Sequence, residues 1–238
     1  MKPKISIITV CYNAVELIEK TIQSVLSQSY DNIEYIIIDG KSTDGTVEVI
    51  QRYAGRLAHW SSEPDGGIFD AMNKGLGLAT GEWVNFMNAG DWFYDDDVVA
   101  QIVEKIDSKL TIIYGNTLYR REKDDAIETA CEPTYLLRNM PTSHQSFFVR
   151  TSLAQDIGFD TSYRYAADYN MMYQIVKRYG IEGILHTDIT VAAYEAFTGL
   201  SMVHANEVYR ETLRIRNHSL NKLYGYIRYF IKKIIGRK

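Results

Sequence analysis

Short apolar runs alternate with segments of helical periodicity over the first 115 residues of the chain. The apolar runs are nearly continuous, as in strands that are covered on both faces, and they span residues 5–10, 35–38, 83–87 and 111–115. Between them, apolar side chains recur at the spacing of amphipathic helices over residues 15–26, 42–53, 71–78 and 98–106. This alternation predicts an α/β fold in which helices flank a mostly parallel sheet.

Polar residues mark the starts of three of these helices. Asn13 is in position to cap the first helix, and Ser42 and Asp44 are in position to cap the second. The acidic residues 95–97 are predicted to lie in the first turn of the fourth helix, where carboxylates complement the positive end of the helix dipole.

The pattern changes after residue 115. Residues 118–129 predict a hairpin, and the apolar residues 146–149 predict a further strand. A helix is expected over residues 167–179, because Gly180 is a natural stop for it. A last β-rich run spans residues 184–194.

The last 32 residues differ from the rest of the chain in charge. Residues 207–238 hold nine Lys or Arg and two Glu, a net charge of +7, whereas residues 1–206 carry −11. Apolar residues recur at helical spacing from Leu220 to Ile235, with basic residues around them, as in helices that lie in a membrane interface. We expect one domain over residues 1–206 and a basic amphipathic helix over residues 207–238 that contacts a membrane surface. Packing on the body or on a partner protein is the alternative.

Composition narrows the class of protein. A chain of 238 residues can bury a stable core without disulfides, and Cys11 and Cys131 lack the spacing of a zinc site, which favours a reducing compartment. The first residues do not form a signal peptide, and every apolar run is shorter than the roughly 20 residues that cross a bilayer. The acidic body argues against nucleic acid as a partner. These observations predict a cytoplasmic protein.

Acidic residues and glycines follow the predicted strands. Asp39 ends the second strand, Asp65 lies in a Pro-Asp-Gly-Gly turn after the Trp60 region, and Asp91 closes the segment Asn-Ala-Gly-Asp after residues 83–87. Ligands collect at the carboxyl ends of strands in open α/β sheets, and glycines let backbone amides approach them closely. Such a cleft suits a nucleotide sugar with a divalent cation, because the cation bridges a carboxylate such as Asp91 to the diphosphate.

Two common phosphate-binding motifs do not match the sequence. A dinucleotide-binding unit requires GxGxxG directly after the first strand, where residues 11–16 read CYNAVE. The P-loop pattern GxxxxGK[ST] does not occur either. The sequence therefore argues against both a dinucleotide-binding protein and a P-loop protein.

Four motifs in order carry a family resemblance: residues 5–13 (ISIITVCYN), 38–46 (IDGKSTDGT), 63–75 (EPDGGIFDAMNKG) and 88–91 (NAGD). Together they resemble the family 2 glycosyltransferases, which are inverting enzymes with the Rossmann-like GT-A fold. The segments 143–145, 167–169 and 199–201 are similar to the branch typified by colanic acid and other bacterial surface-polysaccharide transferases. The resemblance covers roughly residues 4 to 205.

The resemblance implies roles for residues of each motif. The donor-binding residues that it implies are Thr9, Tyr12, Asp39, Asp65, Gly66, Lys74, Asn88 and Asp91. Asp39 would contact the nucleobase or ribose, and Asp65 would face the ribose or diphosphate. Both aspartates also have a purely structural interpretation as turn residues, and Lys74 either neutralises phosphate or favourably ends a short helix.

The resemblance also implies a catalytic base and a metal ligand. Asp168 resembles the base that takes the proton of the acceptor hydroxyl, although an Asp near a helix start also serves as an N-cap. Asn88 replaces the first carboxylate of a DxD-type motif, so Asp91 remains as the ligand of Mn2+ or Mg2+, and the diphosphate is expected to supply most of the site's strength. His144 and Gln145 would contact the acceptor or a phosphate, and a structural role for His144 is equally compatible with the sequence.

The predicted function is transfer of a hexose or N-acetylhexosamine from a nucleoside diphosphate sugar, with a UDP-sugar favoured, to a glycan or lipid-linked glycan. The expected setting is surface-polysaccharide biosynthesis in the cell envelope, with the enzyme peripheral on the inner face of the bacterial cytoplasmic membrane. Two alternatives stay open. A nucleotidyltransferase also uses an acidic α/β site but should carry a phosphate-gripping segment after the first strand, and a catalytically silent glycan- or nucleotide-binding module fits the weakened metal motif.

Overall fold

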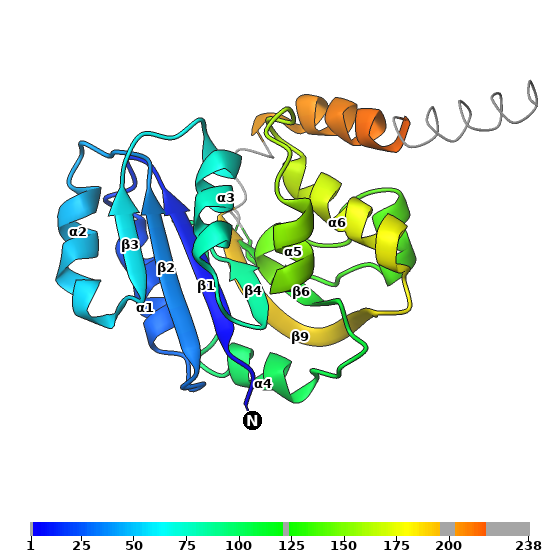
Figure 1. Cartoon of the computed structure of the whole chain (residues 1–238), viewed down its shortest axis with the longest axis horizontal. Helices are drawn as coiled ribbons and strands as arrows, with labels where there is room; N and C mark the ends of the chain where they lie inside the picture. Colours follow the sequence, from blue (N-terminus) through cyan, green and yellow to red (C-terminus); the bar gives the residue numbers. More distant parts are fainter. Residues whose placement is uncertain (1, 121–123, 196–202, 218–238) are drawn as a thin grey trace, which may run out of the picture.

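One sheet with helices on both faces forms the body of the protein (Figure 1). The computed structural model describes residues 2–120, 124–195 and 203–217. The strands are β1 (Ile5–Cys11), β2 (Ile33–Asp39), β3 (His59–Ser62), β4 (Trp83–Phe86), β5 (Trp92–Phe93), β6 (Ile112–Arg120), β7 (Ala126–Glu128), β8 (Phe147–Arg150) and β9 (Ile184–Glu195). The helices are α1 (Ile18–Leu26), α2 (Thr46–Tyr53), α3 (Ile68–Leu78), α4 (Val98–Glu104), α5 (Thr151–Ile157) and α6 (Ala167–Tyr179), with 3-10 turns η1 (Ala54–Arg56), η2 (Pro133–Leu137) and η3 (His144–Ser146).

The sheet divides into a parallel and a mixed half. Its strand order is β3-β2-β1-β4-β8-β6-β9-β5, with β7 paired to β6. β3, β2, β1 and β4 pair in parallel, so their carboxyl ends share one edge. β8 is antiparallel to both β4 and β6, whereas β6 and β9 pair in parallel. The predicted α/β class is confirmed.

Alternating side chains of β1, the central strand, belong to two hydrophobic layers on opposite faces of the sheet. Ile8 and Val10 of β1 face α3, α5 and α6, and Ile5 and Ile7 face α1, α2 and α4. All four side chains are at most 5% exposed. Figure 1 shows α3, α5 and α6 in front of the sheet. A strand covered on both faces needs this continuous apolar sequence.

Gly75 brings α3 close to the sheet. A Cβ atom at this position would lie 2.5 Å from Cγ2 of Ile8, so any side chain would push the helix away from β1. The close approach fixes the helix that follows the loop 63–67 and thereby fixes one wall of the acidic edge.

The helix starts differ from the predicted ones. Asn13 does not cap α1, which begins at Ile18; it adopts a left-handed φ of 46° and its Oδ1 accepts the N–H of Thr43 at 3.0 Å. The acidic residues 95–97 precede α4 and do not enter its first turn. In both places a short polar side chain satisfies loop backbone, which competes with capping for the same residue types.

Three other elements extend or match their predictions. α3 begins at residue 68, three residues earlier than expected, and β6 continues to residue 120 as the first strand of the predicted hairpin. The centre of that hairpin, residues 121–123, lies outside the described residues. α6 spans the predicted residues and ends at Gly180, which has a φ of 83°.

Helical residues 205–217 pack on the body, so the body extends beyond the predicted boundary at residue 206. Ile215 is 1% exposed and belongs to the same hydrophobic layer as α6. In Figure 1 this helix (orange) crosses above the start of α6. The remaining tail, with the apolar stripe from Leu220 to Ile235, and the motif 199–201 lie outside the described residues. Among the helices that are described, none has the length and apolarity to span a bilayer.

Candidate active site

The carboxyl ends of β1 to β4 bring the predicted donor-binding segments to one edge of the sheet. Asp39, the last residue of β2, pairs with Cys11, the last residue of β1. β3 leads into the loop that holds Asp65, and β4 leads into the turn that ends at Asp91. The N–H of Ala89 donates to the carbonyl of Val10 at 3.1 Å and ties this turn to the end of β1. The three carboxylates thus share the edge at which ligands bind in α/β sheets.

Asp39 anchors the loops on either side of β2. It is fully buried; its Oδ2 accepts the N–H of Ser42 at 2.9 Å and the hydroxyl of Ser62 at 2.6 Å, and its Oδ1 accepts the hydroxyl of Ser42 at 2.5 Å. Ser42 is therefore not a helix cap, whereas Asp44 does serve the start of α2 by accepting the N–H of Thr46 at 3.0 Å. The structural interpretation of Asp39 is observed, and its contact with the nucleobase or ribose stays a prediction.

Burial governs the chemistry beside Asp39. Desolvation, followed by the charge of the Asp39 carboxylate, raises the pKa of the Cys11 thiol far above its ordinary value. Cys11 is consequently a buried packing residue that stays protonated at neutral pH. Asp44, by contrast, is exposed, and the hydrogen bond from the Thr46 hydroxyl holds the pKa of its carboxyl below the usual range.

Thr9 lies in β1 and supports the site from inside the sheet, and its donor-binding role stays a prediction. It is fully buried, its hydroxyl donates to the carbonyl of Met87 at 2.7 Å, and it also bonds the Tyr35 hydroxyl at 2.9 Å. Tyr12 is 66% exposed and lies over the edge of the sheet, where its ring can stack on a planar group.

Gly40 lets Tyr12 and Asp65 come together. A Cβ atom at Gly40 would lie 2.7 Å from Oδ2 of Asp65 and 3.3 Å from Cδ2 of Tyr12. Asp65 also forms the predicted turn, because its Oδ1 accepts the N–H of Gly67 at 2.8 Å. The amide of Gly66 is engaged as well and donates to Asp70 at 2.9 Å. Asp65 therefore combines a turn role with a place beside an exposed aromatic ring.

Lys74 holds the loop that carries Asp65. Its ammonium lies 2.9 Å from Oε1 of Glu63, donates to the carbonyl of Pro64 at 2.9 Å and lies 3.8 Å from Asp70. The hydrogen bond to Glu63 and the surrounding carboxylates raise the pKa of Lys74. A phosphate would have to compete with Glu63 for this cation, so neutralisation of phosphate by Lys74 stays a prediction.

The turn from Asn88 to Asp91 holds two side-chain oxygens that are candidate cation ligands. The N–H of Asp91 donates to the carbonyl of Asn88 at 3.0 Å, and Gly90 has the positive φ of 99° that favours glycine. Asn88 and Asp91 are each 7% exposed. Oδ1 of Asn88 is buried and has no hydrogen-bond partner in the described part of the chain, which is costly unless a ligand completes it.

These oxygens fit a divalent cation. Mg2+ typically takes one or two protein carboxylates and fills its shell with phosphate and water oxygens, and Mn2+ prefers the same ligands. Within residues 2–120, 124–195 and 203–217, no group of three or more His, Cys, Asp or Glu is arranged to hold a metal. Asp91, with the amide oxygen of Asn88, would thus hold the cation jointly with a diphosphate.

A chain of contacts leads from this turn to Asp168. Nδ2 of Asn88 lies 3.0 Å from Nε2 of His144, and Nδ1 of His144 lies 3.5 Å from Oδ2 of Asp168. An amide N–H can only donate, so Nε2 accepts and the imidazole proton of a neutral His144 sits on Nδ1, toward the carboxylate. The side chains of His144 and Asp168 are 20% and 18% exposed. The loop histidine therefore joins the predicted metal turn to the predicted base.

Asp168 is not an N-cap. The N-cap position of α6 is Ala166, and Asp168 lies in the first turn, where its Oδ1 accepts the N–H of Tyr169 at 2.7 Å. One carboxylate oxygen is thus fixed by the backbone and the other faces His144. A partly exposed carboxylate held in this way is suited to accept a proton from a bound hydroxyl group.

Gln145 orients Asp91, and its contact with acceptor or phosphate stays a prediction. Its side chain is 2% exposed, and Nε2 donates to Oδ2 of Asp91 at 2.6 Å. The hydroxyl of Ser143 donates to Oε1 of Gln145, and Nδ2 of Asn85 donates to its carbonyl at 2.8 Å. Asn85 was not singled out from the sequence; the signal was a polar residue inside a strand that is otherwise apolar.

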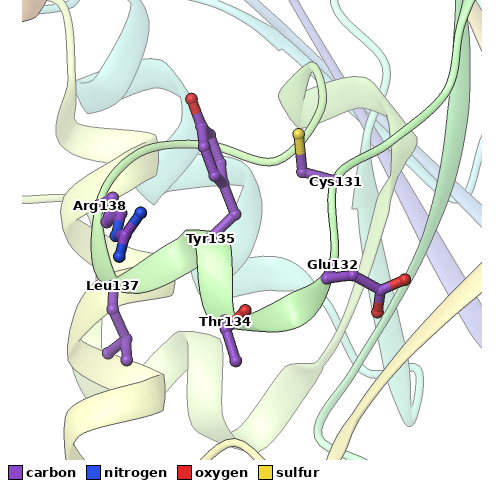
Figure 2. Close-up of a pocket in the computed structure, with 6 residues that line it drawn as sticks. All are labelled: Cys131, Glu132, Thr134, Tyr135, Leu137 and Arg138. Carbon is purple, nitrogen blue, oxygen red and sulfur yellow. The ribbon is translucent and has the colours of Figure 1, made fainter.

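The pocket around η2 contains none of the predicted site residues. Figure 2 shows its lining by Cys131, Glu132, Thr134, Tyr135, Leu137 and Arg138. The cluster at the sheet edge is therefore the candidate site.

Comparison with known proteins identifies the class. Residues 6–171 match the model of Glycosyl transferase family 2, so the chain belongs to this family. An uncharacterized glycosyltransferase of Mycobacterium tuberculosis is 35% identical over 173 residues, which cover 70% of this chain and 66% of the relative. This chain thus spans just under two thirds of that protein. A PGL/p-HBAD biosynthesis glycosyltransferase of Mycobacterium bovis is 30% identical over 211 residues, 84% of this chain and 79% of the relative.

Solved structures establish the GT-A fold. The Staphylococcus aureus protein TarS (residues 1–349), in complex with UDP-GlcNAc, has a TM-score of 0.72 at 20% identity and covers 90% of this chain and 65% of its own. The mannosyltransferase PcManGT of Pyrobaculum calidifontis, in complex with GDP-Man and Mn2+, has a TM-score of 0.69 at 20% identity with the same coverage. At this level of identity the likeness concerns the fold.

Proposed function

We propose that this chain is an inverting glycosyltransferase that moves a hexose or N-acetylhexosamine from a nucleoside diphosphate sugar to a glycan or lipid-linked glycan. The contact chain from Asn88 through His144 to Asp168 carries the proposal, because it joins a carboxylate that would accept the proton to a turn that would bind a diphosphate and its cation. A UDP-sugar is the favoured donor, and surface-polysaccharide biosynthesis is the favoured setting. The UDP-GlcNAc complex of TarS supports the choice of donor. The relative named for PGL/p-HBAD biosynthesis supports the choice of setting.

The reaction is a single displacement in which this chain's residues bind, orient and accept a proton. The oxygen of the acceptor hydroxyl forms a bond to the anomeric carbon, while the bond from that carbon to the diphosphate oxygen breaks and its electron pair leaves with the diphosphate. The hydroxyl proton passes to Oδ2 of Asp168. The Tyr169 N–H and His144 hold that carboxylate in place before the reaction, which avoids reorganisation when the proton moves.

The donor is held at the other end of the same edge. Tyr12 would stack on the base, and Asp65 and Asp39 would face the ribose or base. Asp91 and Asn88 would hold Mn2+ or Mg2+, which when bound offsets the charge of the departing diphosphate. Gln145 keeps Asp91 oriented for this task.

A donor screen tests the proposal. The protein is incubated with Mn2+ and UDP-, GDP- or dTDP-sugars, and thermal stabilisation, release of nucleoside diphosphate and the anomeric configuration of the product are measured. We expect one donor class to stabilise the fold, by about 2.7 kcal/mol at 100 times its dissociation constant, and to give a product of inverted configuration. Release of pyrophosphate from a nucleoside triphosphate, or binding of sugar nucleotides without any transfer or hydrolysis, would contradict it.

We also propose that the basic tail brings the enzyme to an anionic membrane, where a lipid-linked acceptor is found. Each Lys or Arg near such a surface adds up to about 1 kcal/mol before screening, and residues 218–238 hold six of them. The structure refines where to cut: residues 207–217 pack on the body, so removal of the tail after Asn217 spares Ile215 and Glu211.

Truncation after Asn217 should therefore separate membrane binding from catalysis. We expect the shortened protein to lose co-sedimentation with vesicles that contain phosphatidylglycerol, while its turnover with a water-soluble acceptor stays within twofold of the full chain. The full chain at 0.5 M salt is the control, because screening should release it as well. Equal sedimentation of the full and shortened proteins would contradict the membrane role.

A further inference from the structure

Three consecutive backbone amides just before α6 bind one carboxylate from the C-terminal helix. Glu211 accepts the N–H of Arg164 at 2.9 Å through Oε1, and it accepts the N–H groups of Tyr165 and Ala166 at 2.8 and 2.9 Å through Oε2. The separation is 45 to 47 residues in the sequence. Hydrogen bonds to a charged group are stronger than hydrogen bonds between neutral groups.

Other residues of the C-terminal helix and its start also contact the loop that precedes α6. The guanidinium of Arg214 lies 5.0 Å from the centre of the Tyr163 ring, and the rings of His204 and Tyr165 are 4.6 Å apart. Farther along, Nη1 of Arg216 donates to the carbonyl of Arg138, which directly follows η2 and is labelled in Figure 2. Residues 204–217 are thus held to the loop 163–166 at several points and to Arg138 at one more.

This loop determines where α6 begins. Ala166 is the N-cap of the helix, and no side chain of the described residues caps it in the usual way. Asp168 follows two positions later, and Ala166 also accepts the N–H of Asn170 at 2.9 Å, which closes the first turn. A negative charge beside a helix N-terminus is favourable, and here Glu211 supplies that charge from a distant part of the chain.

We propose that Glu211 is a positioning residue for Asp168: by holding the amides of residues 164–166, it fixes the first turn of α6 and therefore the location of the base. Only the effect of Glu211 on catalysis rests on the proposed function. The hold on the loop is a property of the fold. The consequence is large because a misplacement of about 1 Å at a reacting group can cost about 100-fold in rate.

The test compares Glu211→Ala and Glu211→Gln with Glu207→Ala, an exposed position one turn earlier on the same helix. Amide hydrogen exchange measures the protection of residues 164–166 directly. Steady-state kinetics give kcat and KM, and calorimetry with Mn2+ gives the donor affinity. In Glu211→Ala we expect residues 164–166 to exchange at least tenfold faster and kcat to fall about tenfold to 100-fold, with donor affinity within twofold of wild type. Glu211→Gln keeps one acceptor oxygen, so its exchange rate and its kcat should lie between those of Glu211→Ala and wild type. Glu207→Ala should match wild type in both.

Each outcome bears on the proposal. Unchanged exchange in Glu211→Ala would overturn it, as would faster exchange with an unchanged kcat. A parallel loss of donor affinity and of cooperative unfolding would assign Glu211 a general structural role and would also overturn it. If the wild-type chain binds no sugar nucleotide, the proposed function fails, and the exchange comparison alone decides whether Glu211 holds the loop.

Discussion

Replacement of Asp168 by Asn should reduce sugar transfer by about 10² to 10⁴, the range that a positioned general base contributes. The amide is nearly isosteric and can still accept the N–H of Tyr169, which the carboxylate accepts at 2.7 Å. It cannot take up the proton of the acceptor hydroxyl. Steady-state transfer with the donor found by the screen measures the loss, and calorimetry with that donor and Mn2+ should give a dissociation constant within twofold of wild type.

The matched control is Asp156→Asn, which removes a surface carboxylate that pairs with Arg178. It should leave transfer and donor binding unchanged. A weaker donor affinity in Asp168→Asn, or a transfer rate close to wild type, would remove Asp168 from the role of base. Thermal unfolding of both variants checks that the comparison is between folded proteins.

Replacement of Asp91 by Asn should weaken metal-dependent donor binding by at least about 100-fold. Loss of an outer partner of a metal ligand already costs about 10- to 100-fold in affinity or activity, and here the change removes the charge of a proposed ligand. The amide oxygen still accepts from Gln145, which donates to the carboxylate at 2.6 Å, so the fold of the turn is preserved. Calorimetric titration of the donor at several Mn2+ concentrations measures the effect.

Asp31→Asn is the control for this variant, because Asp31 is an exposed aspartate beside Lys2. Donor binding with chelator in place of Mn2+ should be the same in wild type and in Asp91→Asn. A loss that persists in chelator would show that Asp91 supports the fold of the pocket, and an unchanged affinity with Mn2+ would show that it does not hold the cation.

The structure gives Asn88 a reason to be an amide. Its Nδ2 donates to Nε2 of His144 at 3.0 Å, whereas a carboxylate at this position would have no proton to give and would need a protonated imidazole. Its Oδ1 is buried and has no hydrogen-bond partner in the described structure, so it stays free to bind a cation. One side chain thus serves both the metal turn and the histidine, and the departure from a DxD-type motif need not abolish metal use.

The parallel half of the sheet could be predicted from the sequence because its signals are local. The apolar runs of the parallel strands, and the polar residues directly after β2, β3 and β4, predict that Asp39, Asp65 and Asp91 share one edge without knowledge of any long-range contact. α6 was also predictable, because an apolar helical pattern ends at a glycine with a positive φ.

The contacts that complete the site could not be predicted. His144 meets Asn88 across 56 positions, Gln145 meets Asp91 across 54, and Glu211 reaches Arg164 across 47. Such pairs depend on how the mixed half of the sheet and the C-terminal helix fold back. The prediction that Asn13 caps the first helix is wrong, because Asn13 accepts a loop amide instead. The same residue types serve both purposes, so the local sequence cannot separate them.

Paramagnetic broadening by Mn2+ shows whether the turn at Asn88 and Asp91 holds a cation together with a diphosphate next to His144. His59 is the reference, because it begins β3, at the end of the strand opposite to the site. β3 lies three strands away from β4, about 14 Å across the sheet. The imidazole signals of both histidines are recorded with Mn2+ and the nucleoside diphosphate of the preferred donor, in wild type and in Asp91→Asn. We expect the His144 signal to disappear in wild type, the His59 signal to broaden far less, and neither signal to broaden in Asp91→Asn. Equal broadening of the two histidines, or broadening of His144 that survives in Asp91→Asn, would overturn the proposed cation site.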